Sequence, residues 1–218
     1  KNMDITKNMA LMDACIGITE RLFLGYTAKA IIPYASALQR FPAHLQQLMC
    51  ESNGKSVSAY GKELDYPTSP IIFGEPGTMA QHSFFQQLHQ GTDITPVQFI
   101  GFLSTSVEQE GAQKAHEKLL ANMRAQMMAL AMGQESDDPN KYFSGNRPST
   151  ALIAPCMTPQ TLGSLLSFYE NRTMFEAYIL GINAFDQEGV QLGKTLCQKF
   201  LDQKALNPLE QAFSRLGT

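Results

Sequence analysis

Three short apolar runs, separated by long stretches with helical spacing, constrain the fold of this chain more than any other feature. The runs occupy residues 69–74, 95–104 and 149–155, and each combines isoleucine with phenylalanine, valine or leucine. Parallel neighbouring strands need a long crossover, usually a helix, so strands that alternate with helices favour this arrangement. We therefore predict an α/β fold, in which a parallel sheet is flanked by helices on both faces.

The segments outside these runs carry helical signals. Apolar residues recur at helical spacing over 8–32, where Pro33 ends the pattern, and a second helix is expected over 34–50. Residues 1–50 are thus predicted to form a helical segment attached to one α/β domain. Further helices are expected after Thr78 to about residue 90, from a Ser106–Gln109 capping box to Gly133, from Thr158 to about residue 180, over about 186–203, and from Asn207 onward.

Composition limits the possible partners. Apolar residues make up 44% of the 218 residues, enough for a large core, and the formal net charge is −3. Such a chain lacks the positive field that holds nucleic acid or an anionic membrane, and no apolar run approaches the roughly twenty residues that span a bilayer. The four cysteines do not have the spacing of metal ligands. We expect a cytoplasmic protein with reduced thiols and no metal, and neither nucleic acid nor membrane as a partner.

Two polar residues near position 50 are candidates for acid–base chemistry. Gln47 and Glu51 are four residues apart at the end of a predicted helix, so their side chains share a face. Glu51 precedes a Ser-Asn-Gly turn, and a carboxylate at such a junction can be partly desolvated and act as a base. The alternative is an ordinary surface glutamate at a helix end, which is the more common environment.

Two histidines follow the second apolar loop. His82 is expected in the first turn of the helix after Thr78, and His89 lies seven residues on, on nearly the same face. The dipole at a helix N-terminus disfavours a charged imidazole, so His82 could accept a proton from a hydroxyl. A histidine with a purely structural role is the alternative.

Gln187 and Lys194 are also seven residues apart, two turns along one predicted helix. Gly189 and Gly193 lie between them, and each costs about 1 kcal/mol relative to alanine in a helix interior. Such glycines suggest the close approach of a ligand or of another helix. For Lys194 the alternative is a solvated surface lysine.

Several longer strings resemble segments of one enzyme family. Residues 142–148, Tyr-Phe-Ser-Gly-Asn-Arg-Pro, resemble the weakest of four blocks. The three stronger blocks are residues 185–194 (Phe-Asp-Gln-Glu-Gly-Val-Gln-Leu-Gly-Lys), residues 51–55 (Glu-Ser-Asn-Gly-Lys), and residues 74–92, which run from Gly-Glu-Pro-Gly-Thr through Gln-His to His-Gln-Gly-Thr. From about residue 15 to its end, the chain resembles the C-terminal half of the glucose-6-phosphate isomerases (phosphoglucose isomerases).

The chain departs from that family's pattern at a few positions. It has Cys50 where the family has methionine, and Met79-Ala80 where the family has Asn-Gly. Glu188 replaces a tryptophan, and Gln191 replaces a glutamate. These differences bear on the start of the helix near His82 and on the surroundings of Lys194.

The resemblance implies a fold and a reaction. The family's subunits have two sugar-isomerase-type α/β domains, and this chain would be the second domain with its C-terminal helices. The reaction interconverts glucose 6-phosphate and fructose 6-phosphate through an enediol, without a metal, as a step of glycolysis and gluconeogenesis. Glu51 would move a proton between C2 and C1, His82 and Lys194 would assist ring opening, and Gln47 and Gln187 would bind the substrate. The histidine would come from a neighbouring subunit, so a homodimer with shared active sites is expected.

Two elements of the family are not found in this sequence: a phosphate-binding loop rich in serine and threonine, and a Gly-Gly-Arg segment. The chain also begins at Lys1 without a methionine. We therefore expect a fragment that lacks the N-terminal domain and shows little turnover alone. Two alternatives remain open: a non-catalytic sugar-phosphate-binding or regulatory module of the same superfamily, and a dimerisation fragment.

Overall fold

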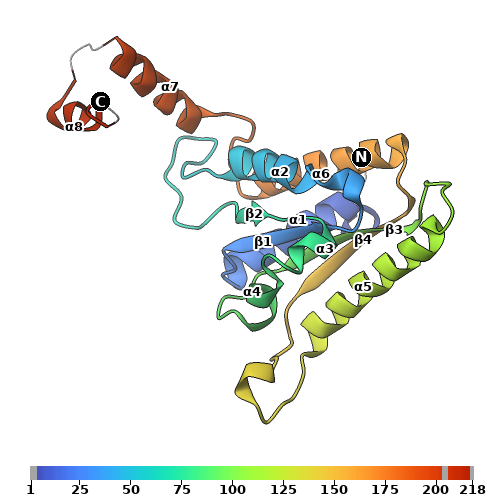
Figure 1. Ribbon diagram of the computed structural model, residues 1–218. Helices are drawn as coiled ribbons and strands as arrows, with labels where there is room; N and C mark the ends of the chain where they lie inside the picture. The colour runs from blue at the N-terminus through green and yellow to red at the C-terminus, as the bar shows by residue number, and fades with distance from the viewer. Residues whose placement is uncertain (1–3, 203–205, 217–218) are drawn as a thin grey trace. The chain divides into compact units, whose positions relative to one another are not determined.

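The computed structural model describes residues 4–202 and 206–216, and the chain divides into two units, 1–184 and 185–218. The first unit is built on a four-stranded sheet in the order β2-β1-β3-β4, and all its pairings are parallel (Figure 1). The predicted parallel sheet is thus confirmed. Its strands are β1 (Ala28–Pro33), β2 (Ile71–Phe73), β3 (Val97–Ser104) and β4 (Ser149–Cys156).

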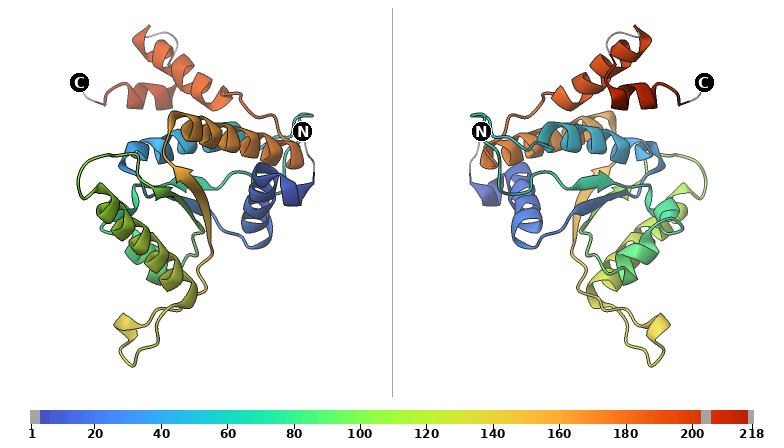
Figure 2. Two further views of the ribbon diagram at one scale, coloured as in Figure 1. Left: turned by 90° about the vertical axis from the view of Figure 1, so that its right-hand side faces the viewer. Right: turned by 90° about the vertical axis from the view of Figure 1, so that its left-hand side faces the viewer.

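Helices cover both faces of this sheet, as predicted, because successive side chains of each strand point to opposite sides. Ile31 of β1 packs with Leu45 and Tyr169 on one face, whereas Ile32 packs with Phe85 and Leu88 on the other. Figure 2 shows the two layers from the side. The first face carries α1 (Met9–Ile18), α2 (Phe41–Gln46) and α6 (Pro159–Ile179), and the second carries α3 (Gly77–Ala80), α4 (Phe85–Gln90) and α5 (Ala112–Met132).

Short irregular helical turns connect these elements. Two of them are π-helical, with one more residue per hydrogen-bonded turn than an α-helix. The π-helical turns are η2 (Thr19–Phe23) and η4 (Gln47–Glu51), and the 3-10 turns are η1 (Ile5–Lys7), η3 (Ser36–Leu38) and η5 (Pro139–Lys141).

The prediction of one helix over 8–32, within a helical segment over residues 1–50, is wrong, and the helix expected over 34–50 is divided into η3, α2 and η4. The helix ends after η2, where Gly25 adopts a positive φ of 73°. Residues 28–33 then form β1, which pairs with both β2 and β3 in the middle of the sheet. The short run of Ala30, Ile31 and Ile32 is fully buried there.

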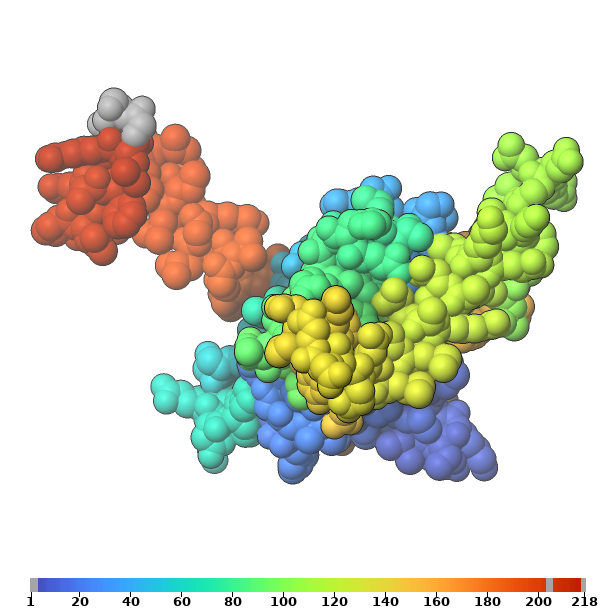
Figure 3. Space-filling view, turned by 60° about the horizontal axis from the view of Figure 1, so that its bottom comes forward, coloured from blue at the N-terminus to red at the C-terminus, as the bar shows by residue number. Residues whose placement is uncertain are grey.

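The start of α5 also differs from the prediction. The expected Ser106–Gln109 capping box does not form, and α5 begins at Ala112, after Gly111. Gly111 has a φ of 79°, which a glycine adopts without strain and which sets the chain's entry into the helix. At its other end α5 leads into the polar segment 134–148, yellow in Figure 3, which an antiparallel bridge between Gln134 and Phe143 closes.

The later helices begin where the sequence predicts. The Thr158 hydroxyl accepts a hydrogen bond from the Thr161 amide and caps α6. The second unit holds α7 (Glu188–Leu201) and α8 (Pro208–Phe213). α8 follows Asn207, as predicted, and Asn207 and Glu210 form a capping box at its start. Among the described residues, no helix has the length and apolar character needed to cross a membrane.

Candidate active site

The predicted base, Glu51, is the last residue of the π-helical turn η4. Its side chain is half-buried, whereas Gln47, the first residue of the same turn, is exposed. One irregular turn therefore contains both residues of the predicted pair. Single π-helical turns are rare and frequently occur at functional sites.

The Ser-Asn-Gly-Lys string after Glu51 forms a closely hydrogen-bonded turn. The Lys55 ammonium donates to the Glu51 carbonyl oxygen at 2.6 Å, and the Gly54 amide donates to the Cys50 carbonyl oxygen at 2.9 Å. A Cβ atom on Gly54 would lie only 2.4 Å from that Cys50 oxygen. The turn therefore requires glycine at position 54.

The side chain of Cys50 connects this turn to the sheet. Its sulfur accepts a hydrogen bond from the Ile72 amide at 3.5 Å and donates to the Pro70 carbonyl oxygen at 3.6 Å. Ile72 is the central residue of β2. The thiol thus joins the residue directly before Glu51 to a strand of the sheet.

A buried polar network lies next to the turn. Asn53 is 1% exposed, and its amide nitrogen donates to the Thr173 carbonyl oxygen at 3.1 Å and to Glu176 Oε2 at 3.2 Å. Arg172, also 1% exposed, pairs with Glu176 Oε1 at 2.8 Å. Its Nε also pairs with the carboxylate of Asp13, on α1. Sequence reasoning missed this network.

Burial and neighbouring charges together set the ionisation of the network. Burial raises the pKa of Glu176, and the positive charges of Arg172 and Lys29 only partly offset this effect. Burial also opposes the charge on Arg172, but the carboxylates of Glu176 and Asp13 outweigh it and raise the pKa of Arg172. A charged guanidinium therefore sits among two acidic side chains.

His82 does not lie where it was predicted. Instead of opening a helix, it follows the short helix α3 in an exposed turn that leads to α4. The break arises at Phe84, whose φ of −133° is not helical and whose ring packs on Phe73 at a centroid distance of 5.0 Å. The argument from a helix N-terminal dipole therefore does not apply to His82.

The other histidine of that region, His89, has structural contacts. Its Nε2 lies 3.1 Å from Gln126 Oε1, and its ring meets that of Phe143 edge-on, with centroids 5.9 Å apart. His89 thus links α4 to α5 and to the segment that follows α5.

Gln187 and Lys194 belong to the second unit. Gln187 is the N-cap residue of α7 and Lys194 lies in its middle, and both side chains are exposed. Added Cβ atoms on Gly189 and Gly193 would meet nothing within 4 Å among the described residues. Within the second unit, the described residues therefore do not make the close approach at Gly189 and Gly193 that the sequence suggested. Within the first unit, Gln47 and Glu51 lie on the same turn, η4. Within the second unit, Gln187 and Lys194 lie on the same helix, α7.

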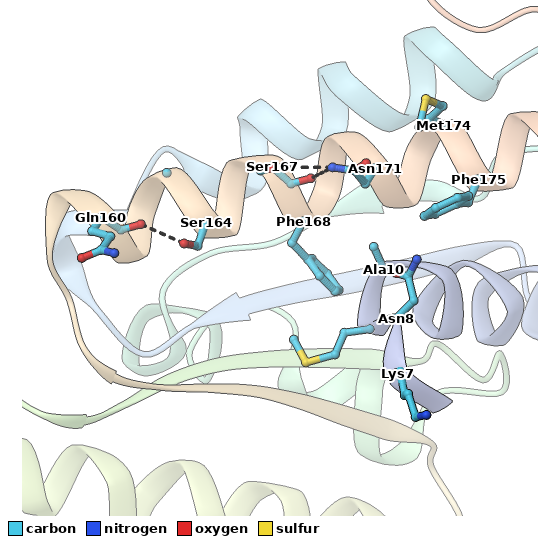
Figure 4. Close-up of a pocket in the computed structure, with 12 residues that line it drawn as sticks. Lys7, Asn8, Ala10, Gln160, Ser164, Ser167, Phe168, Asn171, Met174 and Phe175 are labelled. Carbon is cyan, nitrogen blue, oxygen red and sulfur yellow. Dashed lines mark hydrogen bonds between the residues drawn. The ribbon is translucent and has the colours of Figure 1, made fainter. Parts of the chain in front are cut away.

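A wide groove of the first unit lies away from Glu51. It has a volume of about 1050 Å³ and runs between α6 and the start of α1, lined by side chains such as Phe168, Met174 and Asn171 (Figure 4). The predicted site residues of the first unit, Gln47, Glu51 and His82, do not line it. Within residues 4–202 and 206–216, no three His, Cys, Asp or Glu side chains are grouped so as to hold a metal ion.

Comparison with known proteins gives the family of the chain. A family model described as phosphoglucose isomerase matches residues 1–214. The chain belongs to the phosphoglucose isomerase family. The glucose-6-phosphate isomerase of Treponema pallidum is 54% identical over 204 residues, which cover 92% of this chain and 38% of that protein. That of Treponema denticola is 51% identical over 217 residues, covering 98% of this chain and 41% of that protein.

Solved structures agree with this family assignment. The crystal structure of a glucose-6-phosphate isomerase from Chlamydia trachomatis matches with a TM-score of 0.90 at 48% identity, over 97% of this chain and 42% of that one. The chain therefore spans about two fifths of the length of the phosphoglucose isomerases that it matches.

One departure from the family pattern has a local physical explanation. Glu188, where the phosphoglucose isomerases were expected to have tryptophan, is the first residue of α7 and is exposed. A carboxylate in the first turn of a helix interacts favourably with the helix dipole, by roughly 0.3–1 kcal/mol. The substitution therefore suits the start of α7.

One feature of the sequence weakly indicates the network residues Arg172 and Glu176. They are four residues apart on α6, so they share the helix face that also carries Tyr169 and Thr173, which are buried. A charged pair on an otherwise buried face is unusual, because Arg and Glu are almost never fully buried unless paired.

Proposed function

We propose that the protein to which this chain belongs is an aldose–ketose isomerase that interconverts glucose 6-phosphate and fructose 6-phosphate through an enediol. The observation that carries the proposal is the placement of Glu51, half-buried at the end of a π-helical turn, in a chain that matches the phosphoglucose isomerase family over residues 1–214. The matched relatives are named glucose-6-phosphate isomerase.

In this proposal, Glu51 removes a proton from C2 of the open-chain aldose and returns it to C1. A positioned base of this kind contributes roughly 10²- to 10⁴-fold to the rate. His82 and Lys194 assist the opening of the sugar ring, and Gln47 and Gln187 bind the substrate. The enediolate requires nearby positive charge or hydrogen-bond donors, and such groups commonly supply the largest part of catalysis.

The proposal extends to the assembly. The chain would be the C-terminal sugar-isomerase-type domain of a cytoplasmic homodimer, with His82 supplied to the active site of the neighbouring subunit. The matched relatives are more than twice the length of this chain, which supports a need for a further domain. We therefore expect the isolated 218 residues to show little or no turnover, which a coupled isomerase assay of the purified chain would check.

The decisive test uses a chimaera in which this chain replaces the matched 204 residues of the Treponema pallidum relative. Glu51→Gln should lower kcat by about 10²- to 10⁴-fold while the fold, followed by circular dichroism, is unchanged. Glu110→Gln is the matched control, because Glu110 is an exposed glutamate in the loop before α5. Full turnover in the Glu51→Gln chimaera would refute the proposal that Glu51 is the base, whereas an unsubstituted chimaera that binds the sugar phosphate but does not turn it over would favour a non-catalytic sugar-phosphate-binding module.

A further inference from the structure

Two buried residues of α6 contact the chain on both sides of Glu51. Arg172 and Glu176, which we call the α6 clamp, are one turn apart and joined by an ion pair of 2.8 Å. The clamp residues are 1% and 5% exposed. Neither is among the residues assigned to the reaction above.

The clamp holds the residues before Glu51 through a sulfur contact. Arg172 Nη1 lies 3.3 Å from the Sδ atom of Met49, two residues before Glu51 in η4. Met49 is 1% exposed, so its side chain is fully enclosed by the core of this face. This contact fixes the middle of the π-helical turn.

The clamp holds the residues after Glu51 through an amide. Asn53, two residues after Glu51, donates to Glu176 Oε2 at 3.2 Å and to the Thr173 carbonyl oxygen at 3.1 Å. The backbone carbonyl oxygen of Asn53 accepts a hydrogen bond from the Ser69 backbone amide at 3.3 Å. The backbone that carries Glu51 is therefore held at both ends against α6.

The clamp is itself anchored to the sheet and to α1. Arg172 pairs with Asp13 of α1, and Asp13 accepts a hydrogen bond from Gln98 Nε2 of β3 at 2.8 Å. Gly17 of α1 lies so close that an added Cβ would be 2.4 Å from Arg172 Nη2. The clamp thus has little room to shift.

Stability alone is a poor explanation for such a pair. A buried ion pair loses about as much in desolvation as it gains in attraction, and well-packed apolar residues often stabilise a core equally well. Here one guanidinium faces two carboxylates, so the desolvation cost is greater still. Where buried polar groups are retained, the gain can be a uniquely defined geometry.

We propose that the α6 clamp is a positioning element for Glu51, setting the backbone of residues 49–53 so that the carboxylate meets the sugar carbons in the right place. The inference rests on the function proposed above. A displacement of a catalytic group by about 1 Å can cost roughly 10²-fold in rate. Loss of the clamp should therefore lower kcat more than it raises KM, since the substrate-binding residue Gln47 is exposed and lies outside the segment 49–53 that the clamp holds.

The test measures kcat and KM in the same Treponema pallidum chimaera, with one variant on each side of the contact between Asn53 and Glu176. Asn53→Ala removes the amide after Glu51, and the isosteric Glu176→Gln changes the clamp with little change in volume. We expect each to lower kcat by about 10- to 100-fold with less than about threefold change in KM. Wild-type kcat in both variants would overturn the inference.

Two controls separate positioning from general destabilisation. Glu170→Gln alters an exposed glutamate of the same helix, and Leu130→Ala opens a cavity in the core on the other face of the sheet. Leu130→Ala should lower the melting temperature but leave kcat unchanged at a temperature where the chimaera is folded. If Leu130→Ala lowers kcat as much as Asn53→Ala does, the positioning role is refuted.

A double-mutant cycle shows whether the clamp acts through Glu51. Groups that act as a unit are strongly non-additive, so Asn53→Ala should cause no further loss of kcat in the Glu51→Gln background. A full further loss there would refute action through Glu51. The two proposals fail differently: activity in Glu51→Gln refutes the function, whereas an inactive Glu51→Gln beside fully active Asn53→Ala and Glu176→Gln refutes only the clamp.

Discussion

Replacement of Arg172 by methionine should strongly destabilise the first unit. The guanidinium is 1% exposed, and the side chains of its partners Asp13 and Glu176 are 8% and 7% exposed. Arg172→Met keeps an apolar stem but leaves two carboxylates buried without their cation. Removing one partner of a buried ion pair costs about 3–5 kcal/mol. In a chain of this size, 1 kcal/mol corresponds to about 2–4 °C, so the melting temperature should fall by about 6–20 °C.

Thermal unfolding of the 218-residue chain at neutral pH, followed by circular dichroism, measures this fall. The matched control is Arg124→Met on α5, where the arginine is exposed and the effect should stay within about 0.5 kcal/mol. Adding Asp13→Asn and Glu176→Gln to Arg172→Met removes the uncompensated charges and should recover at least half of the loss. The reasoning would be refuted by a melting temperature within about 2 °C of wild type for Arg172→Met, or by a triple variant as unstable as the single one.

Three further predictions concern the same unit. Gly17→Ala should cost about 1–3 kcal/mol by urea denaturation, because its Cβ would lie 2.4 Å from Arg172 Nη2 and 2.6 Å from Glu176 Oε1; an unchanged midpoint would contradict this crowding. Burial raises the pKa of Glu176 above its usual 4.5, so its contribution to stability is full below about pH 4.5 and is lost as the pH rises through the higher folded value. Glu176→Gln should therefore gain stability relative to wild type between about pH 4.5 and neutrality, and a constant difference in melting temperature would count against it. Burial also raises the pKa of Tyr34 to about 12, so an absorbance titration should show a phenol ionising near there that disappears in Tyr34→Phe.

The sheet could be predicted from the sequence in large part, but β1, one of its two inner strands, could not. Lys29 lies within β1 and is 2% exposed, because its ammonium pairs with Glu20 Oε2 at 2.8 Å. Lys29 makes the apolar run of β1 short, so the run does not stand out as a strand. The helical spacing before Gly25 can be extended past it because periodicity carries no information on strand pairing. The run from Ala30 to Ile32, bounded by Gly25 and Pro33, was the available signal.

The candidate site was likewise predictable from the sequence only in part. Glu51 and its turn could be found locally, because Gly54 and the helix end lie within a few residues of it. The partners of that turn could not, since Asn53 and Glu176 are 123 positions apart and only the packing of α6 on the first face brings them together. His82 was misplaced because the Phe84 ring packs on Phe73. This contact between a loop and a strand interrupts the helix.

The π-helical geometry of η4 makes the length of this segment as important as its composition. Each residue advances an α-helix by about 100°, so deleting one residue between Gln47 and Cys50 could restore a regular helix yet swing position 51 to another side. Such a deletion would preserve every side chain of the Glu-Ser-Asn-Gly-Lys string while pointing its first member elsewhere. Among relatives of this protein, insertions and deletions should therefore be tolerated in the largely exposed segment 135–141 and excluded from 47–53.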